Sequence, residues 1–87
     1  MRFSFSESAW DEYLYWQRQD KKTLKRINNL LESVARDGAL CGLGKPEVLK
    51  YSKSGQISRR IDETNRLVYR LSGDEVIIDS CRGHYED

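Results

Sequence analysis

The chain has 87 residues and a mass of 10.2 kDa, a length that suits a single domain spanning 1–87. Charged residues make up 33% of the sequence and hydrophobic residues 38%, so a core can form and a disordered chain is excluded. Apolar runs such as Val76-Ile77-Ile78 are far too short to cross a membrane, and the N-terminus lacks a signal-peptide segment. We therefore expect a soluble, cytoplasmic protein with no membrane partner.

The net charge of +1 is the sum of segments with opposite charges. Residues 38–70 hold seven basic and three acidic side chains, a net of +4, whereas residues 71–87 have a net charge of −4. Guanidinium groups bind phosphate bidentately, so the arginine-rich middle segment is suited to a polyanion. The alternative is that these charges only solvate exposed strands, which is common in sheets.

The two cysteines, Cys41 and Cys81, have neither CxxC nor Cys/His spacing. This pattern predicts two reduced thiols, with no disulfide and no zinc site. Phosphate-binding loops, dinucleotide-binding turns, HExxH motifs and nucleophile elbows are also missing from the sequence. We therefore predict no metal and no cofactor.

The first 38 residues predict a strand followed by two helices. Phenylalanine alternates with polar residues over 2–6, as in a strand with one buried face. Ser6 or Ser8 can cap a first helix, and Asp20 can cap a second one that ends at Gly38. The second helix carries an apolar stripe at helical spacing: Leu24, Ile27, Leu30, Leu31 and Val34. We expect the two helices to form a hairpin.

Beyond residue 38, a glycine-containing loop precedes four short runs of period two. We predict strands at 47–51, 56–61, 66–71 and 75–82. The turns between them are too short for helical crossovers, so these strands must pair as an antiparallel meander. The order β-α-α-β-β-β-β predicts an α+β fold, with the helix hairpin on one face of a twisted, mainly antiparallel sheet and the first strand at an edge.

Alternation along these strands predicts which side chains face the helices. The inward set is Leu49, Tyr51, Ile57, Ile61, Leu67, Tyr69 and Leu71. The outward set is Lys50, Ser58, Arg60, Arg66, Val68 and Arg70, which stacks Lys50, Arg60 and Arg66 on one cationic face. Arg59 shares parity with the inward residues, and we expect its head to reach water from the edge of the core. The large aromatic residues expected to matter most for the core are Trp10, Tyr13, Trp16, Tyr51 and Tyr69.

Three residues could together support acid-base chemistry. His84 is the only histidine, Glu47 follows Pro46 at the start of a predicted strand, and Arg66 begins another. A base for a ribose 2′-hydroxyl, a cation for the phosphorane and an acid for the leaving oxygen suffice for metal-free RNA cleavage. From spacing alone, an exposed tail histidine and an ordinary surface glutamate remain the alternatives.

Five motifs in order resemble one family over essentially the whole chain. They are SAWDEYLYWQ at 8–17, GKPEVLK at 44–50, SRRI at 58–61, NRLVY at 65–69 and CRGHY at 81–85. The sequence resembles the YoeB toxins of bacterial type II toxin-antitoxin modules, within the RelE/ParE-like superfamily. The resemblance implies a RelE-like fold and a ribosome-dependent endoribonuclease, or mRNA interferase, that cuts mRNA in the ribosomal A site and inhibits translation.

The resemblance also implies roles by motif position. Glu47 corresponds to the general base, Arg66 to the transition-state cation, His84 to the general acid and Tyr85 to a residue that supports or stacks on the substrate. The implied substrate-binding residues are Lys50, Arg60 and Arg59. The chain continues past the usual terminal His-Tyr pair with Glu86-Asp87, and two effects of these carboxylates remain open: favouring the protonated acid, or repelling RNA.

The partners implied by the resemblance are the ribosome with its mRNA and a cognate YefM/Phd-like antitoxin that wraps the toxin. The family also implies a homodimer, and contact with operator DNA only through the antitoxin. Two other functions remain open: a non-catalytic ParE-type inhibitor of DNA gyrase, and an inactive toxin that acts only as a co-repressor with its antitoxin. Glu47 with His84 favours the nuclease, because a pure binder needs no paired base and acid.

Overall fold

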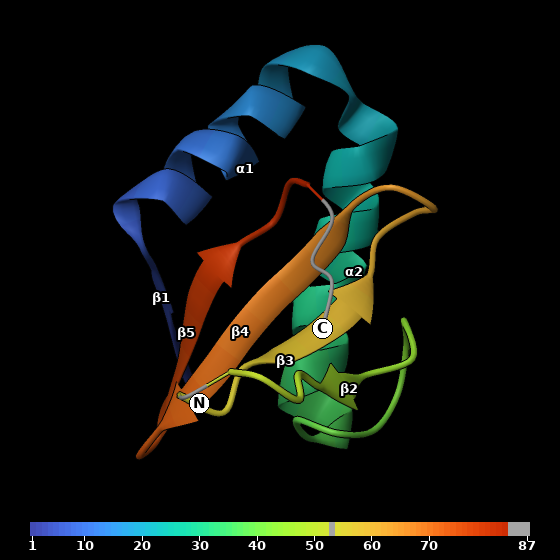
Figure 1. The fold of residues 1–87 in the computed structure, drawn as a ribbon. Coiled ribbons are helices and arrows are strands. Elements are labelled where there is room, and N and C mark those ends of the chain that lie inside the picture. Colours follow the sequence, from blue (N-terminus) through green and yellow to red (C-terminus); the bar gives the residue numbers. More distant parts are fainter. Residues whose placement is uncertain (53, 84–87) are drawn as a thin grey trace.

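The computed structural model describes residues 1–52 and 54–83, which form two helices and a five-stranded sheet (Figure 1). In chain order the elements are β1 (Arg2–Phe5), α1 (Glu7–Gln19), α2 (Lys21–Asp37), β2 (Glu47–Val48), β3 (Ile57–Arg60), β4 (Arg66–Ser72) and β5 (Glu75–Ser80). The predicted α+β fold and element order are confirmed. His84, Tyr85, Glu86 and Asp87 lie outside the described residues.

The sheet has the strand order β1-β5-β4-β3-β2. Strands β2 to β5 pair as the predicted antiparallel meander, because short turns join each to the next. β1 lies at the edge and runs parallel to β5, with Phe5 opposite Ile78. The sheet is therefore mixed, and the predicted edge position of the first strand is confirmed.

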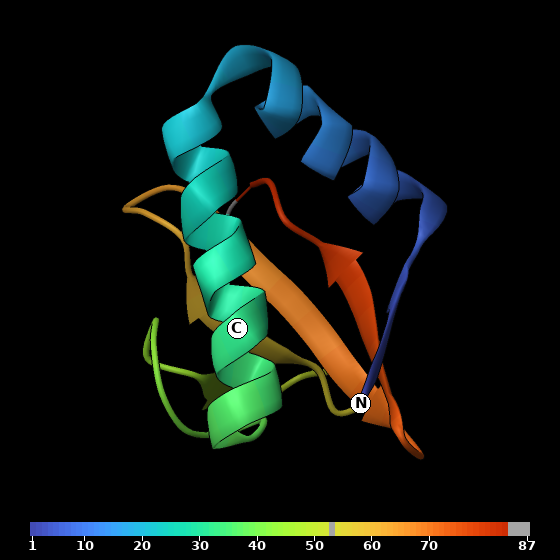
Figure 2. The same ribbon diagram turned by 180° about the vertical axis from the view of Figure 1, so that it is seen from behind.

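Both helices begin and end where the capping residues predict. The Ser6 hydroxyl accepts a hydrogen bond from the Ala9 amide at the start of α1. Asp20 separates the helices, because its amide closes α1 on the Trp16 carbonyl while its carboxylate accepts the Lys22 amide of α2. α2 ends at Gly38, whose φ of 97° favours glycine. Figure 2 shows α2 lying across one face of the sheet.

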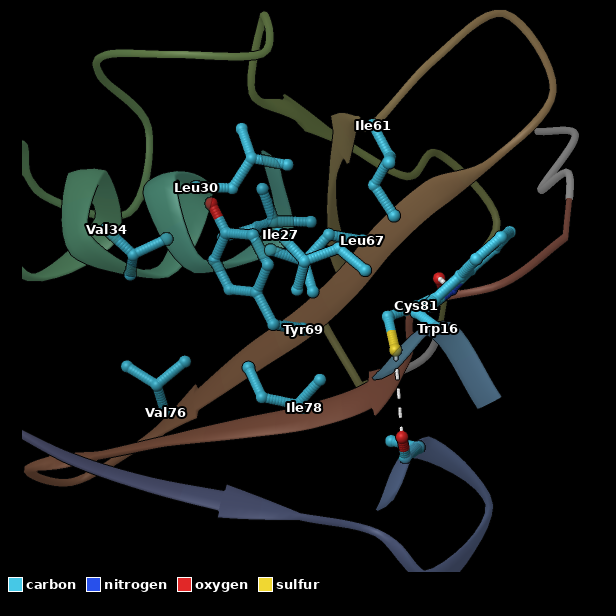
Figure 3. Packing of buried hydrophobic residues seen from close by; sticks show 12 residues of the cluster. Trp16, Ile27, Leu30, Val34, Ile61, Leu67, Tyr69, Val76, Ile78 and Cys81 are labelled. Atoms are coloured by element: carbon cyan, nitrogen blue, oxygen red, sulfur yellow. Dashed lines mark hydrogen bonds between the residues drawn. The ribbon is translucent and has the colours of Figure 1, made fainter. Parts of the chain in front are cut away.

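The core fills the space between the helices and that face of the sheet (Figure 3). Its buried residues are Ala9, Trp16, Ile27, Leu30, Val34, Ile57, Ile61, Leu67, Tyr69, Val76, Ile78 and Cys81. Trp16 donates its indole N–H to the Cys81 carbonyl at 2.8 Å, and the Cys81 thiol lies 3.6 Å from the Ala9 carbonyl. These contacts fix α1 on the segment that follows β5.

Three residues assigned to the core are exposed instead. Tyr51 is 80% exposed, Leu71 49% and Trp10 47%. Tyr51 lies beyond the end of β2, and Leu71 is the next-to-last residue of β4. Trp10 stacks on the outside of the core against Tyr13, with ring centroids 5.7 Å apart. The predicted core positions of these three side chains are wrong.

The two thiols are free, Cys41 exposed and Cys81 buried. Burial raises the pKa of Cys81 to about 12, with a further contribution from the charge of Glu12. Neither helix is long and apolar enough to span a membrane.

Candidate active site

Two arginines lie directly opposite each other on adjacent strands. Arg60 of β3 pairs with Arg66 of β4. Both alternate with residues that face the helices, so they lie on the sheet face turned away from the helices, here called the outer face. Like charges in such a pair repel. Within residues 1–52 and 54–83, the recorded ion pairs are Arg36 with Asp37 and Arg70 with Asp79, so the side-chain charges of this pair are not neutralised by contact. An anion is the natural complement to the pair.

Glu47 lies on the same face of the sheet as this arginine pair. It pairs with Ser58 of β3, and Ser58 lies two residues from Arg60, so the three side chains share the outer face. Diagonal neighbours of this kind are about 7–8 Å apart at their α-carbons. Glu47 is exposed. A carboxylate on β2, Arg60 on β3 and Arg66 on β4 thus lie on one face of three adjacent strands.

A tight loop delivers Glu47 to this position. Gly44 has a φ of 83°, and a Cβ there would come within 2.7 Å of the Leu30 side chain. The Gly44 carbonyl accepts the Arg60 amide at 2.7 Å, which ties the loop to β3. Lys45 also has a positive φ, 51°, an uncommon conformation for a side-chain-bearing residue. The chain then enters β2 at Glu47.

The segment after β5 is tied to the start of β4. The Arg66 amide donates to the Gly83 carbonyl at 3.0 Å, and the Gly83 amide donates to the Asn65 side-chain oxygen at 2.8 Å. The Asn65 side-chain amide in turn donates to the Asp62 carboxylate. Both the amide and the carbonyl of Gly83 are therefore hydrogen-bonded. Gly83 thus lies beside the start of β4.

The comparisons with known proteins identify the family. The model of the family described as "YoeB-like toxin of bacterial type II toxin-antitoxin system" matches residues 5–85. The chain belongs to the YoeB toxin family. It is 49% identical over 86 residues to Toxin YoeB of Synechocystis sp., covering 99% of each chain.

Solved YoeB structures have the same fold as this chain. The YoeB dimer from Staphylococcus aureus superposes with a TM-score of 0.92 at 47% identity, covering 98% of each chain. YoeB in the heterotetrameric YoeB-YefM toxin-antitoxin complex from the same species gives a TM-score of 0.89 at 47% identity, again covering 98% of each chain. The predicted family and the RelE-like fold are therefore confirmed.

Two of the YoeB family positions, His84 and Tyr85, lie outside the described residues, and their roles stay predictions. Lys50 does not lie in a strand, because β2 ends at Val48 and Lys50 belongs to the following turn. The predicted three-strand stack of cations is therefore wrong in its first member, while Arg60 and Arg66 are placed as predicted. Lys50 is exposed on the turn that follows Glu47, and its role as a substrate contact stays a prediction.

The strand phase around Glu47 also differs from the prediction. Val48, not Leu49, pairs with Ile57 and shares the helix-facing side with it. Leu49 is buried but does not belong to the core cluster between helices and sheet. Val68 points to the outer face as predicted, yet it is fully buried, so this face is not wholly a polar surface. The inward assignment of Leu49 is wrong.

Arg59 differs most from its predicted surroundings. Its exposed fraction is 0%, and its guanidinium lies inside the protein rather than at the edge of the core. It hydrogen-bonds Tyr69, Ser33 and the carbonyls of the loop that follows α2. The prediction that its guanidinium reaches water is wrong, because these buried partners accept its hydrogen bonds inside the protein. We assign Arg59 no contact with RNA below.

Sequence reasoning missed the residues that support this site. From the sequence, neither Asp62 nor Asn65 has a role at the site, yet their side chains connect the β3–β4 turn to Gly83. An Asp three residues before an Asn is a common turn pattern, and only the return of the chain after β5 gives it this further use. In the described residues, no group of three or more His, Cys, Asp or Glu side chains gathers as a metal site.

Proposed function

We propose that this YoeB family member is a ribosome-dependent endoribonuclease that cleaves mRNA in the ribosomal A site and thereby inhibits translation. The observation that carries the proposal is the placement of Glu47 on the outer face beside the cross-strand pair Arg60 and Arg66. Base and cations in one place meet two of the three requirements for cleavage at a ribose 2′-hydroxyl. The third requirement, an acid, falls to His84.

In the proposed reaction, the Glu47 carboxylate takes the proton of the 2′-hydroxyl as that oxygen attacks the adjacent phosphorus. The P–O5′ bond breaks, and His84 donates a proton to the departing 5′-oxygen. The products are a 2′,3′-cyclic phosphate on one fragment and a 5′-hydroxyl on the other. All atoms come from the RNA and these two side chains, so the chemistry needs no metal and no cofactor.

The arginines stabilise the charge that develops on phosphorus. Arg66 is half-buried, which strengthens its interaction with an anion relative to a fully exposed cation. Arg60 is exposed and suits a neighbouring phosphate, as does Lys50 on the turn beyond Glu47. Tyr85 supports or stacks on the substrate, since aromatic rings hold unstacked bases without strong sequence preference.

The proposal includes the ribosome and an antitoxin as partners. A chain of 87 residues has little surface left for elaborate RNA recognition, so presentation of the codon by the ribosome fits its size. Because the S. aureus complex joins YoeB to YefM, we propose a YefM-like antitoxin for this chain, with operator DNA contacted only through it. The S. aureus YoeB dimer supports a homodimer here. The toxin acts in the cytoplasm, where translation occurs.

Primer extension on a reporter mRNA in a purified translation system tests this function. With ribosomes present, the wild-type chain should produce new 5′ ends within A-site codons, and Glu47→Gln should abolish them. Glu63→Gln, an exposed glutamate in the β3–β4 turn, is the matched control and should cleave like wild type. Intact mRNA together with inhibited DNA gyrase would instead identify a ParE-type poison.

A second arm distinguishes the co-repressor. If the chain neither cleaves mRNA nor inhibits gyrase, yet strengthens operator binding by its antitoxin in a gel-shift assay, then it is an inactive toxin. Cleavage that proceeds equally well on free mRNA would contradict the ribosome dependence alone, because the acid-base chemistry would survive. Each outcome therefore selects one function.

A further inference from the structure

We infer that Arg59 is a positioning residue for Glu47: from inside the core, it holds the loop of residues 38–44 whose end places the base on the outer face. The inference rests on the proposed function only in the role given to Glu47. The buried Arg59 guanidinium takes no part in the cleavage chemistry itself. Arg59 never contacts RNA in this scheme.

The guanidinium binds one short stretch of backbone at several points. Arg59 is fully buried, and its N–H groups donate to loop carbonyls. These acceptors and distances are Gly38 at 2.7 Å, Ala39 at 3.3 Å, Cys41 at 2.7 Å and Leu43 at 2.9 Å. Four carbonyls within six residues thus converge on one side chain. The planar guanidinium has five N–H donors and can bond all these acceptors, whereas the three donors of a lysine ammonium cannot reach them all.

All the hydrogen-bond acceptors of Arg59 in the described part of the chain are neutral. Besides the four carbonyls, they are the Tyr69 hydroxyl at 2.8 Å and the Ser33 hydroxyl at 3.0 Å. Burying a cation is costly unless its donors are satisfied, and here backbone carbonyls replace the water that the guanidinium loses. No carboxylate hydrogen-bonds it in the described residues, so Arg59 and the loop hold each other in position.

Ser33 and Tyr69 connect the same loop to α2 and β4. The Ser33 hydroxyl donates to Asp37 at 2.8 Å and accepts the Leu43 amide at 3.0 Å. The Tyr69 hydroxyl donates to the Ala39 carbonyl. Burial raises the pKa of Tyr69, so its phenol keeps the proton that this bond uses. The loop has no helix or strand of its own and depends on these three side chains.

The loop is continuous with the base. Gly44 lies against the Arg59 Cβ, where an added Cβ would come within 3.1 Å of it. Glu47 follows three residues later, in a strand of only two residues. Such a short strand contributes few hydrogen bonds, so the position of Glu47 depends on the loop that precedes it. Loosening the loop should move the base and release the Arg60 amide from Gly44, while both arginine side chains stay on their strands.

Single-turnover cleavage of ribosome-bound mRNA, measured at rising toxin concentration, tests the inference. Arg59→Lys should lower the maximal rate on the order of 100-fold, because misplacing a reacting group by about 1 Å has such effects. The toxin concentration giving half-maximal rate should stay within about twofold, since the RNA-contacting side chains remain. Ser33→Ala, a milder change in the same network, should lower the maximal rate about tenfold.

Ile78→Val is the matched control for lost stability. Ile78 is fully buried on β5, opposite Tyr69, but its aliphatic side chain makes no hydrogen bond to the loop. It should lower the melting temperature while leaving the maximal rate close to wild type. If Arg59→Lys fails to fold, Ser33→Ala carries the test. A maximal rate in the folded Arg59→Lys or Ser33→Ala protein equal to that of Ile78→Val would overturn the inference.

Amide hydrogen exchange gives a readout that does not depend on activity. The Leu43 amide bonds Ser33 and the Arg60 amide bonds Gly44, so both report on the loop. Both amides should lose protection in Arg59→Lys and keep it in Ile78→Val. If the wild-type chain cleaves no mRNA, the proposed function fails, and exchange alone judges Arg59: lost protection supports its hold on the loop, and retained protection refutes it.

Discussion

The backbone amide of Arg66 donates a 3.0 Å hydrogen bond to the carbonyl of Gly83, the residue immediately before His84 in the sequence. This bond joins the start of β4, which carries the proposed transition-state cation, to the segment that leads to the proposed acid. The Asn65 side chain supplies the second bond, from the Gly83 amide. The cation and the start of the tail are therefore positioned by adjacent residues of one turn.

Replacing Asn65 by alanine should weaken this connection. The change removes the acceptor for the Gly83 amide and the bond to Asp62, so we expect a loss of about 1 kcal/mol of stability. We also expect the maximal cleavage rate to fall more than stability explains. Denaturant unfolding and single-turnover cleavage measure the two effects. Asn29→Ala, an exposed position on α2, is the control. Cleavage equal to that of the control would show that Asn65 does not position the tail.

Arg66 of the arginine pair should matter for the cleavage rate but little for stability. Arg66→Ala should remove about 2–4 kcal/mol of transition-state stabilisation and slow single-turnover cleavage accordingly. Arg66 repels Arg60 across the strands but attracts the Asp62 carboxylate, so the two effects oppose each other and the same change should leave the melting temperature close to wild type. Arg70→Ala, whose guanidinium pairs with Asp79, is the control and should instead lower stability without affecting chemistry. A large loss of stability in Arg66→Ala would contradict an unneutralised pair.

The turn between β3 and β4 should become less stable in acid. Burial raises the pKa of Asp62, but hydrogen bonds from Asn65 and Thr64, together with the charge of Arg66, hold the pKa below its ordinary 3.8. A pKa that is lower in the folded state adds stability above the unfolded value, and that stability is lost as the pH falls through the folded value.

Unfolding of Asp62→Asn measured from pH 6 down to about pH 2 checks this effect. At pH 6 the variant should be less stable than wild type, and the difference should shrink below about pH 3.8 as the wild-type carboxylate becomes protonated. Asp11→Asn, an exposed position on α1, should show a smaller difference. A difference for Asp62→Asn that is constant with pH would contradict the assigned hydrogen bonds.

The two cysteines should differ strongly in reactivity. Cys41 is exposed, whereas burial raises the pKa of Cys81 to about 12 and keeps its thiol protonated at neutral pH. Iodoacetamide should therefore alkylate one thiol rapidly in the native protein and the second only after unfolding. Mass spectrometry of wild type and Cys41→Ser gives the count. Rapid alkylation of native Cys41→Ser would contradict the buried position of Cys81.

The sequence predicted those parts of the site that depend on local pairing. Arg60 and Arg66 flank one five-residue turn, so their opposition follows from the shortness of that turn and the alternation of the two strands. The strand at Glu47 could not be phased in the same way. Val48 and Leu49 are both apolar, and two paired residues leave no run long enough for alternation to decide between them.

The surroundings of Arg59 are a second feature that could not be predicted from the sequence. Its parity with Ile57 correctly predicts that it points toward the helices. Its acceptors, however, are backbone carbonyls from Gly38 to Leu43, and backbone carbonyls leave no signature in a sequence. From the sequence, the Arg59 guanidinium is expected to reach water. In the structure, carbonyls of a loop nearly 20 residues earlier in the chain surround it instead. Tertiary contacts between distant segments decide such cases.

The central claim is that the chain cleaves mRNA through a ribose 2′-hydroxyl, and one substrate change tests it directly. Two otherwise identical mRNAs are placed on ribosomes, one with ribose and one with 2′-deoxyribose at the nucleotide whose 2′-oxygen attacks. The wild-type chain should cut the first, leaving a cyclic phosphate and a 5′-hydroxyl, and should leave the second intact at that position. Cleavage of the deoxy substrate at the same bond would contradict the proposed mechanism.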